Sequence, residues 1–194
     1  MTITVGINGF GRIGRATLAH ISESLRNDIK VVKVNATGPV ETAAHLMRYD
    51  SVHGRFPHTV TVEEGCMDLG RGPIEMFSTY DMDTLDWSGV DVVLECTGNF
   101  NDGLKAQKHL ERGEQVLYLL PEIALTTQIT TRLKRHFGNK LGIYHSKFSS
   151  EERVEVYRDL LEEKNYQIIL GVRSSIFLPF SHLGLIIIAE EHEH

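Results

Sequence analysis

The chain has 194 residues, of which 41% are hydrophobic and 24% charged, and its formal net charge is -6 at pH 7. This composition excludes a fibrous or disordered chain and predicts a globular protein with one substantial core, or one core and a small appendage. The negative net charge argues against strong non-specific attraction to nucleic acid. The longest apolar run, LGLIIIA, is too short to cross a bilayer, so we expect no membrane partner.

The ends of the chain and its cysteines indicate a compartment. The N-terminus passes directly into TITVGI without a basic region or a long apolar segment, so we expect no secretory signal. Cys66 and Cys96 form neither a disulfide framework nor a zinc pattern, which favours a reducing cytoplasm. The terminal AEEHEH offers His192 and His194 as weak metal ligands, but an acidic tail is the simpler interpretation and we expect no metal site.

Short β-rich segments alternate with amphipathic helical segments, which is typical of a parallel sheet wrapped by helices. We expect strands at Thr2–Ile7, Lys30–Asn35, Val90–Glu95, Gln115–Leu119, Leu141–Tyr144, Tyr166–Gly171 and Leu185–Ile188. We expect helices at Arg12–Ser24, Val40–Tyr49, Gly103–Arg112, Ala124–Phe137 and Ser149–Lys164. The segments HTVTVEE and IEMFST are predicted to pair as antiparallel strands beside the main sheet. The fold class is therefore α/β, with a Rossmann-like, mostly parallel, doubly wound sheet.

Three glycines follow the first expected strand in the segment GINGFGRIGR. Gly9, Gly11 and Gly14 form G-x-G-x-x-G between that strand and the next helix. Such glycines permit a tight turn, close approach of a pyrophosphate to the backbone and close packing of helix on sheet, and the helix N-terminus offers free N–H groups to the anion. The context favours dinucleotide binding over a purely structural turn.

The second expected strand ends in VVKVNATGP, without the usual acid. A dinucleotide site commonly carries a carboxylate there, which bonds the ribose hydroxyls and repels a 2′-phosphate. Here Asn35 is followed by Ala36. The predicted cofactor is therefore NAD or NADP, with the preference open; the alternative is that both residues only shape a turn before Gly38.

Three ordered blocks make the first part of the chain resemble a known family. GINGFGRIGR, HLMRYDSVHGRF and DVVLECTGNF resemble the NAD-binding half of phosphorylating glyceraldehyde-3-phosphate dehydrogenases over residues 1–113. The resemblance implies a cofactor site lined by Asn8, Gly9, Phe10, Gly11, Arg12 and Ile13. It also implies that Asn35 lies near the adenosine ribose and that Thr97, Gly98 and Phe100 lie along the cofactor. The family usually has an acid where Ala36 stands.

The catalytic half of that family is not recognisable in the sequence. Its cysteine nucleophile lies in an S-C-T-T-N stretch, activated by a later histidine, and this chain contains no such stretch. Oxidation of an aldehyde through a covalent intermediate needs a thiolate and a base that activates it. We predict structural roles for Cys66 and Cys96, assign no catalytic residue, and expect no dehydrogenase activity.

The second part of the chain resembles a different family. QVLYLLPEIALTTQ, LGIYHSKFSSEERVEV, IILGVRSSIFLPF and LGLIIIAEEHEH resemble part of the RecA-like ATPase domain of the PriA-type primosomal helicase over residues 114–194. The sequence lacks the G-x-x-x-x-G-K-[ST] loop that holds nucleotide phosphates, and Ala189 stands where the family's D-E-E-H box begins. Arg132, Lys134, Arg135 and Lys140 could face a nucleic-acid backbone, but the solvated face of a helix is the interpretation we favour.

The sequence thus predicts two domains, 1–113 and 114–194, joined at a seam within GEQVLYLLPEIALTTQ. Four hypotheses remain open: a dinucleotide-binding module, a dehydrogenase, a nucleotide- or DNA-binding remnant of a helicase, and a chimera without an evolved activity. We favour a chimera whose residual function is NAD(P) binding. The expected partner is a dinucleotide, nucleic acid is not favoured, and the oligomeric state stays open.

Overall fold

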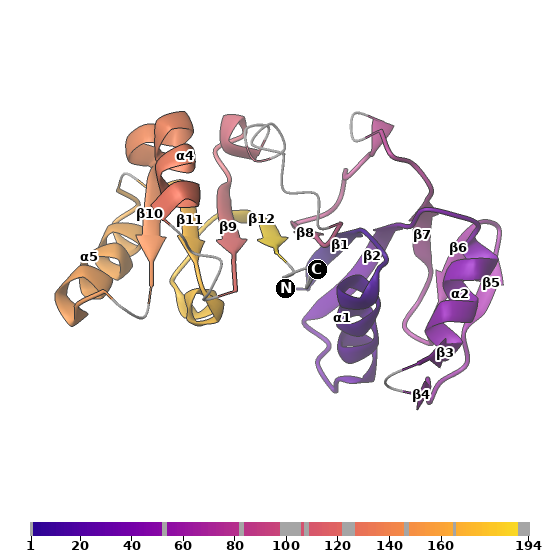
Figure 1. The fold of residues 1–194 in the computed structure, drawn as a ribbon. Coiled ribbons are helices and arrows are strands. Elements are labelled where there is room, and N and C mark those ends of the chain that lie inside the picture. Colours follow the sequence, from indigo (N-terminus) through magenta and orange to yellow (C-terminus); the bar gives the residue numbers. More distant parts are fainter. Residues whose placement is uncertain are drawn as a thin grey trace. The chain divides into compact units, whose positions relative to one another are not determined.

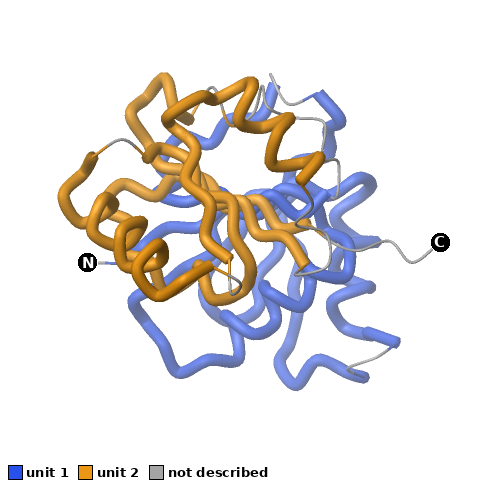
Figure 2. The backbone as a smooth tube through the Cα atoms, turned by 60° about the vertical axis from the view of Figure 1, so that its left-hand side comes forward, with its two compact units in different colours: residues 1–97 blue, residues 98–194 orange. Residues whose placement is uncertain are grey.

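The structure of the protein is a computed structural model that describes residues 2–51, 54–81, 84–97, 106, 109–121, 127–145, 148–164 and 166–189. The chain divides into two compact units, residues 1–97 and 98–194, which are called unit 1 and unit 2 (Figure 2). The α-helices and strands described below are labelled in Figure 1. Both are α/β and both contain parallel strands, so the predicted fold class is confirmed.

Unit 1 is built on a sheet in the order β8-β1-β2-β7-β6-β5. Its strands are β1 (Ile3–Asn8), β2 (Ile29–Asn35), β5 (Thr61–Glu63), β6 (Cys66–Asp68), β7 (Ile74–Phe77) and β8 (Val92–Glu95). β1 lies parallel to both β2 and β8, and β2 lies parallel to β7. The helices are α1 (Arg12–Glu23) and α2 (Val40–Arg48), and β3 (Tyr49–Asp50) pairs with β4 (Gly54–Arg55).

The two segments predicted to pair with each other do not do so. β5 and β7 each pair antiparallel with β6, a strand that the sequence analysis missed. Glu64 and Gly65 connect β5 to β6, and both have positive φ values, 48° and 80°. Two consecutive residues with positive φ make the tight turn that suits a two-residue hairpin. The hairpin therefore closes locally, and β7 joins β2 in the main sheet.

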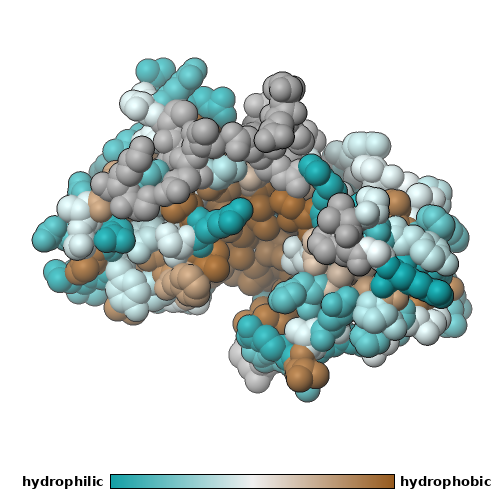
Figure 3. All heavy atoms as spheres, turned by 60° about the horizontal axis from the view of Figure 1, so that its bottom comes forward, coloured by the Kyte–Doolittle hydropathy of each residue, from teal (hydrophilic) through white to brown (hydrophobic). Residues whose placement is uncertain are grey.

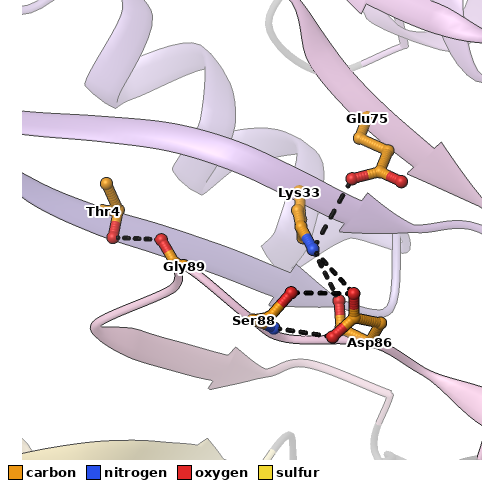
Figure 4. Close-up of polar contacts among 6 residues, drawn as sticks. All are labelled: Thr4, Lys33, Glu75, Asp86, Ser88 and Gly89. Carbon is orange, nitrogen blue, oxygen red and sulfur yellow. Dashed lines mark hydrogen bonds and ion pairs between the residues drawn. The ribbon is translucent and has the colours of Figure 1, made fainter.

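The loop before β8 is fastened to the sheet by polar contacts (Figure 4). Lys33 Nζ donates to the carbonyl of Asp86 at 2.9 Å and lies 3.6 Å from the Glu75 carboxylate. The Thr4 hydroxyl donates to the carbonyl of Gly89 at 2.8 Å. Trp87 lies so close to β1 that a Cβ on Gly6 would be 2.6 Å from its ring. These contacts hold β8 beside β1, and therefore bring the ends of the two strands together.

Unit 2 has four parallel strands in the order β10-β11-β9-β12. They are β9 (Gln115–Leu119), β10 (Leu141–Tyr144), β11 (Ile168–Gly171) and β12 (Leu183–Ile188). The helices are α4 (Thr127–Phe137) and α5 (Ser150–Leu161), with short 3-10 helices η3 (Gly138–Lys140) and η4 (Arg173–Phe177). Leu117 and Ile169 of the sheet pack against Val156 and Leu160 of α5.

Two helix ends in unit 2 follow the sequence analysis. The Ser149 side chain accepts from the N–H of Glu152, whose carboxylate accepts from the N–H of Ser149, so α5 begins at a reciprocal cap. Gly113 has a φ of 77°, and its N–H donates to the carbonyl of Leu110 at 3.0 Å, as at many helix ends. Of the helix expected over Gly103–Arg112, residues 103–105, 107 and 108 lie outside the described residues, as do residues 124–126 of the next.

Candidate functional site

The glycine turn after β1 is forced by close backbone contacts. Gly9 has a φ of 97°, and a Cβ on it would lie 2.7 Å from the carbonyl carbon of Cys96. A Cβ on Gly14 would lie 2.1 Å from the carbonyl oxygen of Gly9. Gly11 differs, because a Cβ there would meet no atom within 4 Å. Gly9 and Gly14 are therefore needed by the fold itself, whereas the space above Gly11 is open.

The open space lies at the N-terminus of α1. The helix begins at Arg12, and the Gly11 position before it provides no side-chain cap for the first N–H groups. The first turn contains no acidic residue, so no carboxylate of that turn neutralises the positive end of the helix dipole. Arg12 is exposed and Ile13 is half-buried. This arrangement suits an anionic group placed over Gly11.

A buried polar network lies beneath the turn. Asn8 Nδ2 donates to Glu95 Oε2 at 2.5 Å, and Asn35 Nδ2 donates to Asn8 Oδ1 at 2.9 Å. The Asn35 amide also donates to the carbonyl of Thr79 and accepts from its N–H. The N–H of Thr97 donates to Glu95 Oε1 at 2.9 Å. The network joins the carboxyl ends of β1, β2 and β8, and fixes the floor of the candidate site.

Glu95 is a member of this network that the sequence analysis did not assign to the site. It is buried at the end of β8, where its carboxylate accepts from both Asn8 and Thr97. A signal for it exists in DVVLECTG, because the acid ends an apolar strand that was expected to lie in the same parallel sheet as the glycine turn. Buried carboxylates need such partners, since an unpaired buried charge is costly.

The structure places most of the predicted site residues at one edge of the sheet. Asn8, Gly9 and Gly11 line the turn, and Asn35 lies beside them on β2, where its carbonyl accepts from the N–H of Gly9 at 3.0 Å. Phe10 is buried in the hydrophobic core. The predicted residues Gly98 and Phe100 lie outside the described residues, whereas Arg12, Ile13 and Thr97 lie within them.

Ala36 and Cys96 contribute backbone hydrogen bonds and packing contacts near this edge, whereas Cys66 lies on β6. Ala36 is buried, and its N–H donates to the carbonyl of Phe77 at 2.9 Å. Cys96 packs against the core of unit 1, and its N–H donates to the carbonyl of Asn8. Cys66 belongs to β6 and forms no disulfide. Within the described ranges, no group of three or more histidine, cysteine or acidic side chains is placed to hold a metal ion.

The corresponding edge of unit 2 is less complete. His145 follows β10 and Ser175 belongs to η4, and both are buried. Ser175 Oγ has no hydrogen-bond partner among the residues that the structure describes. Arg132, Lys134 and Arg135 are exposed on α4. Ala189 ends the described part of the chain, so Glu190 and the rest of AEEHEH lie outside it, as do residues 122–126 of the PEIALTTQ segment.

No described helix has both the length and the apolar character needed to cross a membrane.

A helix beginning at a glycine turn after the first strand of a parallel sheet, over a floor of buried polar side chains, defines a Rossmann-type dinucleotide-binding unit. Residues 3–103 match the family model of the glyceraldehyde 3-phosphate dehydrogenase NAD-binding domain, and residues 98–194 match that of the DEAD/DEAH box helicases. The chain therefore belongs to the glyceraldehyde 3-phosphate dehydrogenase family through its NAD-binding domain, and its second half is helicase-like.

Curated relatives agree with the first of these matches. Glyceraldehyde-3-phosphate dehydrogenase of Cereibacter sphaeroides is 53% identical over 122 residues, which are 62% of this chain and 37% of the relative. The enzyme of Xanthobacter flavus is 44% identical over 157 residues, 79% of this chain and 44% of the relative. The chromosomal enzyme of Cupriavidus necator is 46% identical over 116 residues, 58% of this chain and 34% of the relative. The chain thus spans less than half the length of these relatives.

Proposed function

We propose that unit 1 of this protein binds NAD or NADP and is fused to a helicase-like segment. We also propose that the protein does not carry out the dehydrogenase reaction. The observation that carries the proposal is the open space over Gly11 at an uncapped helix N-terminus, held by Gly9 and Gly14, which tolerate no side chain. The pyrophosphate of the dinucleotide would lie in that space and accept hydrogen bonds from the first N–H groups of α1.

The proposed roles of the other residues follow from their contacts. The amide hydrogens of Asn35 are donated to Asn8 and Thr79, so Asn35 acts chiefly by ordering the site. Arg12 is exposed beside the turn and supplies positive charge near the phosphates. Ala36 offers no carboxylate to a ribose hydroxyl and does not repel a 2′-phosphate, so we propose that NAD and NADP both bind. Thr97, Gly98 and Phe100 are proposed to lie along the cofactor.

Inactivity as a dehydrogenase follows from the missing nucleophile. The sequence has no S-C-T-T-N stretch, which is the segment in which this family carries the cysteine that attacks the aldehyde. We place the junction of the two parts at Gly113, which ends the preceding helix and leads into β9. We further propose that the protein acts in the cytoplasm.

Titration calorimetry with NAD, NADP and ATP on one preparation tests the proposal. We expect NAD and NADP to bind, and the variant Gly11→Val to lose at least tenfold in affinity, because its side chain fills the space over α1 without disturbing its neighbours. Ala16→Val, which adds the same side chain at an exposed position of α1, is the matched control and keeps its affinity. Failure of the wild type to bind either dinucleotide would overturn the proposal.

A second candidate function rests on the helicase-like match. LLPEIALTTQ and GVRSSIF support the PriA type within the DEAD/DEAH helicases, and exposed Arg132, Lys134 and Arg135 give α4 a basic surface. A nucleotide- or DNA-binding fragment of this kind would lack the phosphate loop, and Ala189 begins its acidic box. Binding of ATP without binding of NAD or NADP in the same titration would favour this candidate.

A further inference from the structure

The hydrogen bonds beneath the glycine turn run in one direction across four neighbouring strands, β7, β2, β1 and β8 (Figure 1). Thr79 follows β7 by two residues, and its N–H donates to Asn35 Oδ1 at the end of β2, at 3.1 Å. Asn35 Nδ2 donates to Asn8 Oδ1 at the end of β1, at 2.9 Å. Asn8 Nδ2 donates to Glu95 Oε2 at the end of β8, at 2.5 Å. Every donor in this relay therefore points toward Glu95.

Backbone donors fix both ends of the relay. Thr79 donates its N–H at one end, and the N–H of Thr97 donates to Glu95 Oε1 at 2.9 Å at the other. A carboxylate accepts at both of its oxygens, whereas an asparagine amide has one accepting and one donating side. Two amides between two backbone donors are satisfied only if one further member of the relay accepts on both sides. Glu95 is that member.

The relay lies inside unit 1, where a lost hydrogen bond is not replaced by water. On the face of unit 1 at the right of Figure 3, teal hydrophilic residues lie at the surface, whereas Asn8, Asn35 and Glu95 are 0%, 4% and 4% exposed. A buried donor without an acceptor is costly. An amide in place of the carboxylate at position 95 would leave two donors facing each other at one point of the relay, whichever way the asparagine amides turn.

We propose that Glu95 is a positioning residue of the dinucleotide site, which sets the direction of the Asn8 and Asn35 amides and thereby the position of the segment after β7. Asn35 also donates to the carbonyl of Thr79 at 2.9 Å, so this segment is fastened to the end of β2 by two hydrogen bonds. The role rests on the proposed function, in which Asn35 lies near the adenosine ribose. Glu95 then orders the adenosine side of the site from the opposite side of β1, through Asn8 and Asn35.

An exchange of the carboxylate and the amide between β8 and β1 tests this role. Glu95→Gln alone creates the mismatch of donors, and Asn8→Asp alone places two carboxylates against each other. In the double variant, the carboxylate at position 8 accepts from Asn35 on one side and from the new amide at position 95 on the other. The oxygen of that amide still accepts from the N–H of Thr97. The double variant keeps the net charge of the wild type.

Titration calorimetry of the full chain with NAD and NADP measures the effect on binding. We expect Glu95→Gln to weaken dinucleotide binding about tenfold or more, and the double variant to bind within about threefold of the wild type. Loss of a buried negative charge beneath the phosphates would by itself strengthen the binding of an anion, so a weakening points to the hydrogen bonds and not to the charge. Glu63→Gln, the same substitution at an exposed position of β5, is the matched control and leaves binding unchanged.

Urea unfolding followed by Trp87 fluorescence reads the relay without ligand. We expect each single variant to lower the midpoint and the double variant to restore it. Equal binding by the wild type and Glu95→Gln overturns the role of Glu95, and so does a double variant whose losses are the sum of the two single losses. If the wild type binds neither dinucleotide, the proposed function fails and the role in binding fails with it, and a restored midpoint then assigns the relay to the fold alone.

Discussion

The two units use the same kind of sheet but differ in how fully its carboxyl edge is closed. In unit 1, α1 buries Gly14 and Leu18 against the strands, and the polar side chains beneath the turn are hydrogen-bonded to one another. In unit 2, α4 buries no residue, and buried Ser175 Oγ has no partner within the described residues. Both sheets are packed by a helix, α1 in unit 1 and α5 in unit 2. The carboxyl edge of unit 1 differs because the polar side chains beneath its glycine turn are hydrogen-bonded, and a binding edge requires such satisfied polar groups.

The contrast predicts that the fold of unit 1 fails when its glycine turn is altered. Gly14→Ala places a Cβ 2.1 Å from the carbonyl oxygen of Gly9, and a backbone atom cannot move aside without moving the turn. We expect a loss of about 3 kcal/mol or more in the free energy of unfolding. Urea denaturation followed by the fluorescence of Trp87, the only tryptophan in the chain, measures this loss in unit 1.

The matched control for this substitution is Gly11→Ser. It adds a side chain in open space, at a position before a helix where serine is favoured, and we expect a change within about 0.5 kcal/mol. If both variants lose the same free energy of unfolding, the close contact between position 14 and the carbonyl of Gly9 is not what requires glycine in this turn.

A smaller effect is expected in unit 2 from the substitution Ser149→Ala. It removes the side-chain cap of α5, and such a loss typically costs about 1 kcal/mol. The far-ultraviolet circular dichroism transition, which includes unit 2, should move to lower urea, while the Trp87 fluorescence transition stays in place. Ser150→Ala, one residue later, leaves the cap intact and is the control. A shift of both transitions together would mean that the two units unfold as one.

Much of this fold was predictable from local sequence pattern. β9 and β10 have the predicted bounds, because both are short, mostly apolar runs of the kind that forms buried strands of a parallel sheet. The cap at Ser149 follows from an S-x-x-E pattern. The hairpin of β5 and β6 was missed because Glu64 lies in the left-handed region, which residue type alone rarely signals. Glu95 was missed because its role depends on Asn8, 87 residues away in the sequence.

The smallest predicted effect tests how β8 is fastened beside β1. The N–H of Thr4 donates to Asp91 Oδ2 at 2.7 Å, and the Thr4 hydroxyl shares its single proton between this oxygen, at 2.9 Å, and the carbonyl of Gly89. These hydrogen bonds hold the pKa of Asp91 below its ordinary value. A carboxylate with a lowered pKa stabilises the folded state at a pH above its ordinary pKa of about 4, and this stabilisation is lost as the pH falls through the lowered value.

Asp91→Asn removes this titration while retaining an oxygen that can accept from Thr4. Because Asp91 is exposed, we expect the variant to lose less than about 1 kcal/mol at pH 7, and to lose less stability than the wild type between pH 5 and roughly pH 3. Trp87 fluorescence in urea at each pH measures both differences, since Trp87 lies in the same loop as Gly89, to which Thr4 also donates. If the two proteins lose stability in parallel as the pH falls, the hydrogen bonds from Thr4 do not stabilise the ionised carboxylate, and the fastening of β8 depends on Trp87 and Lys33 instead.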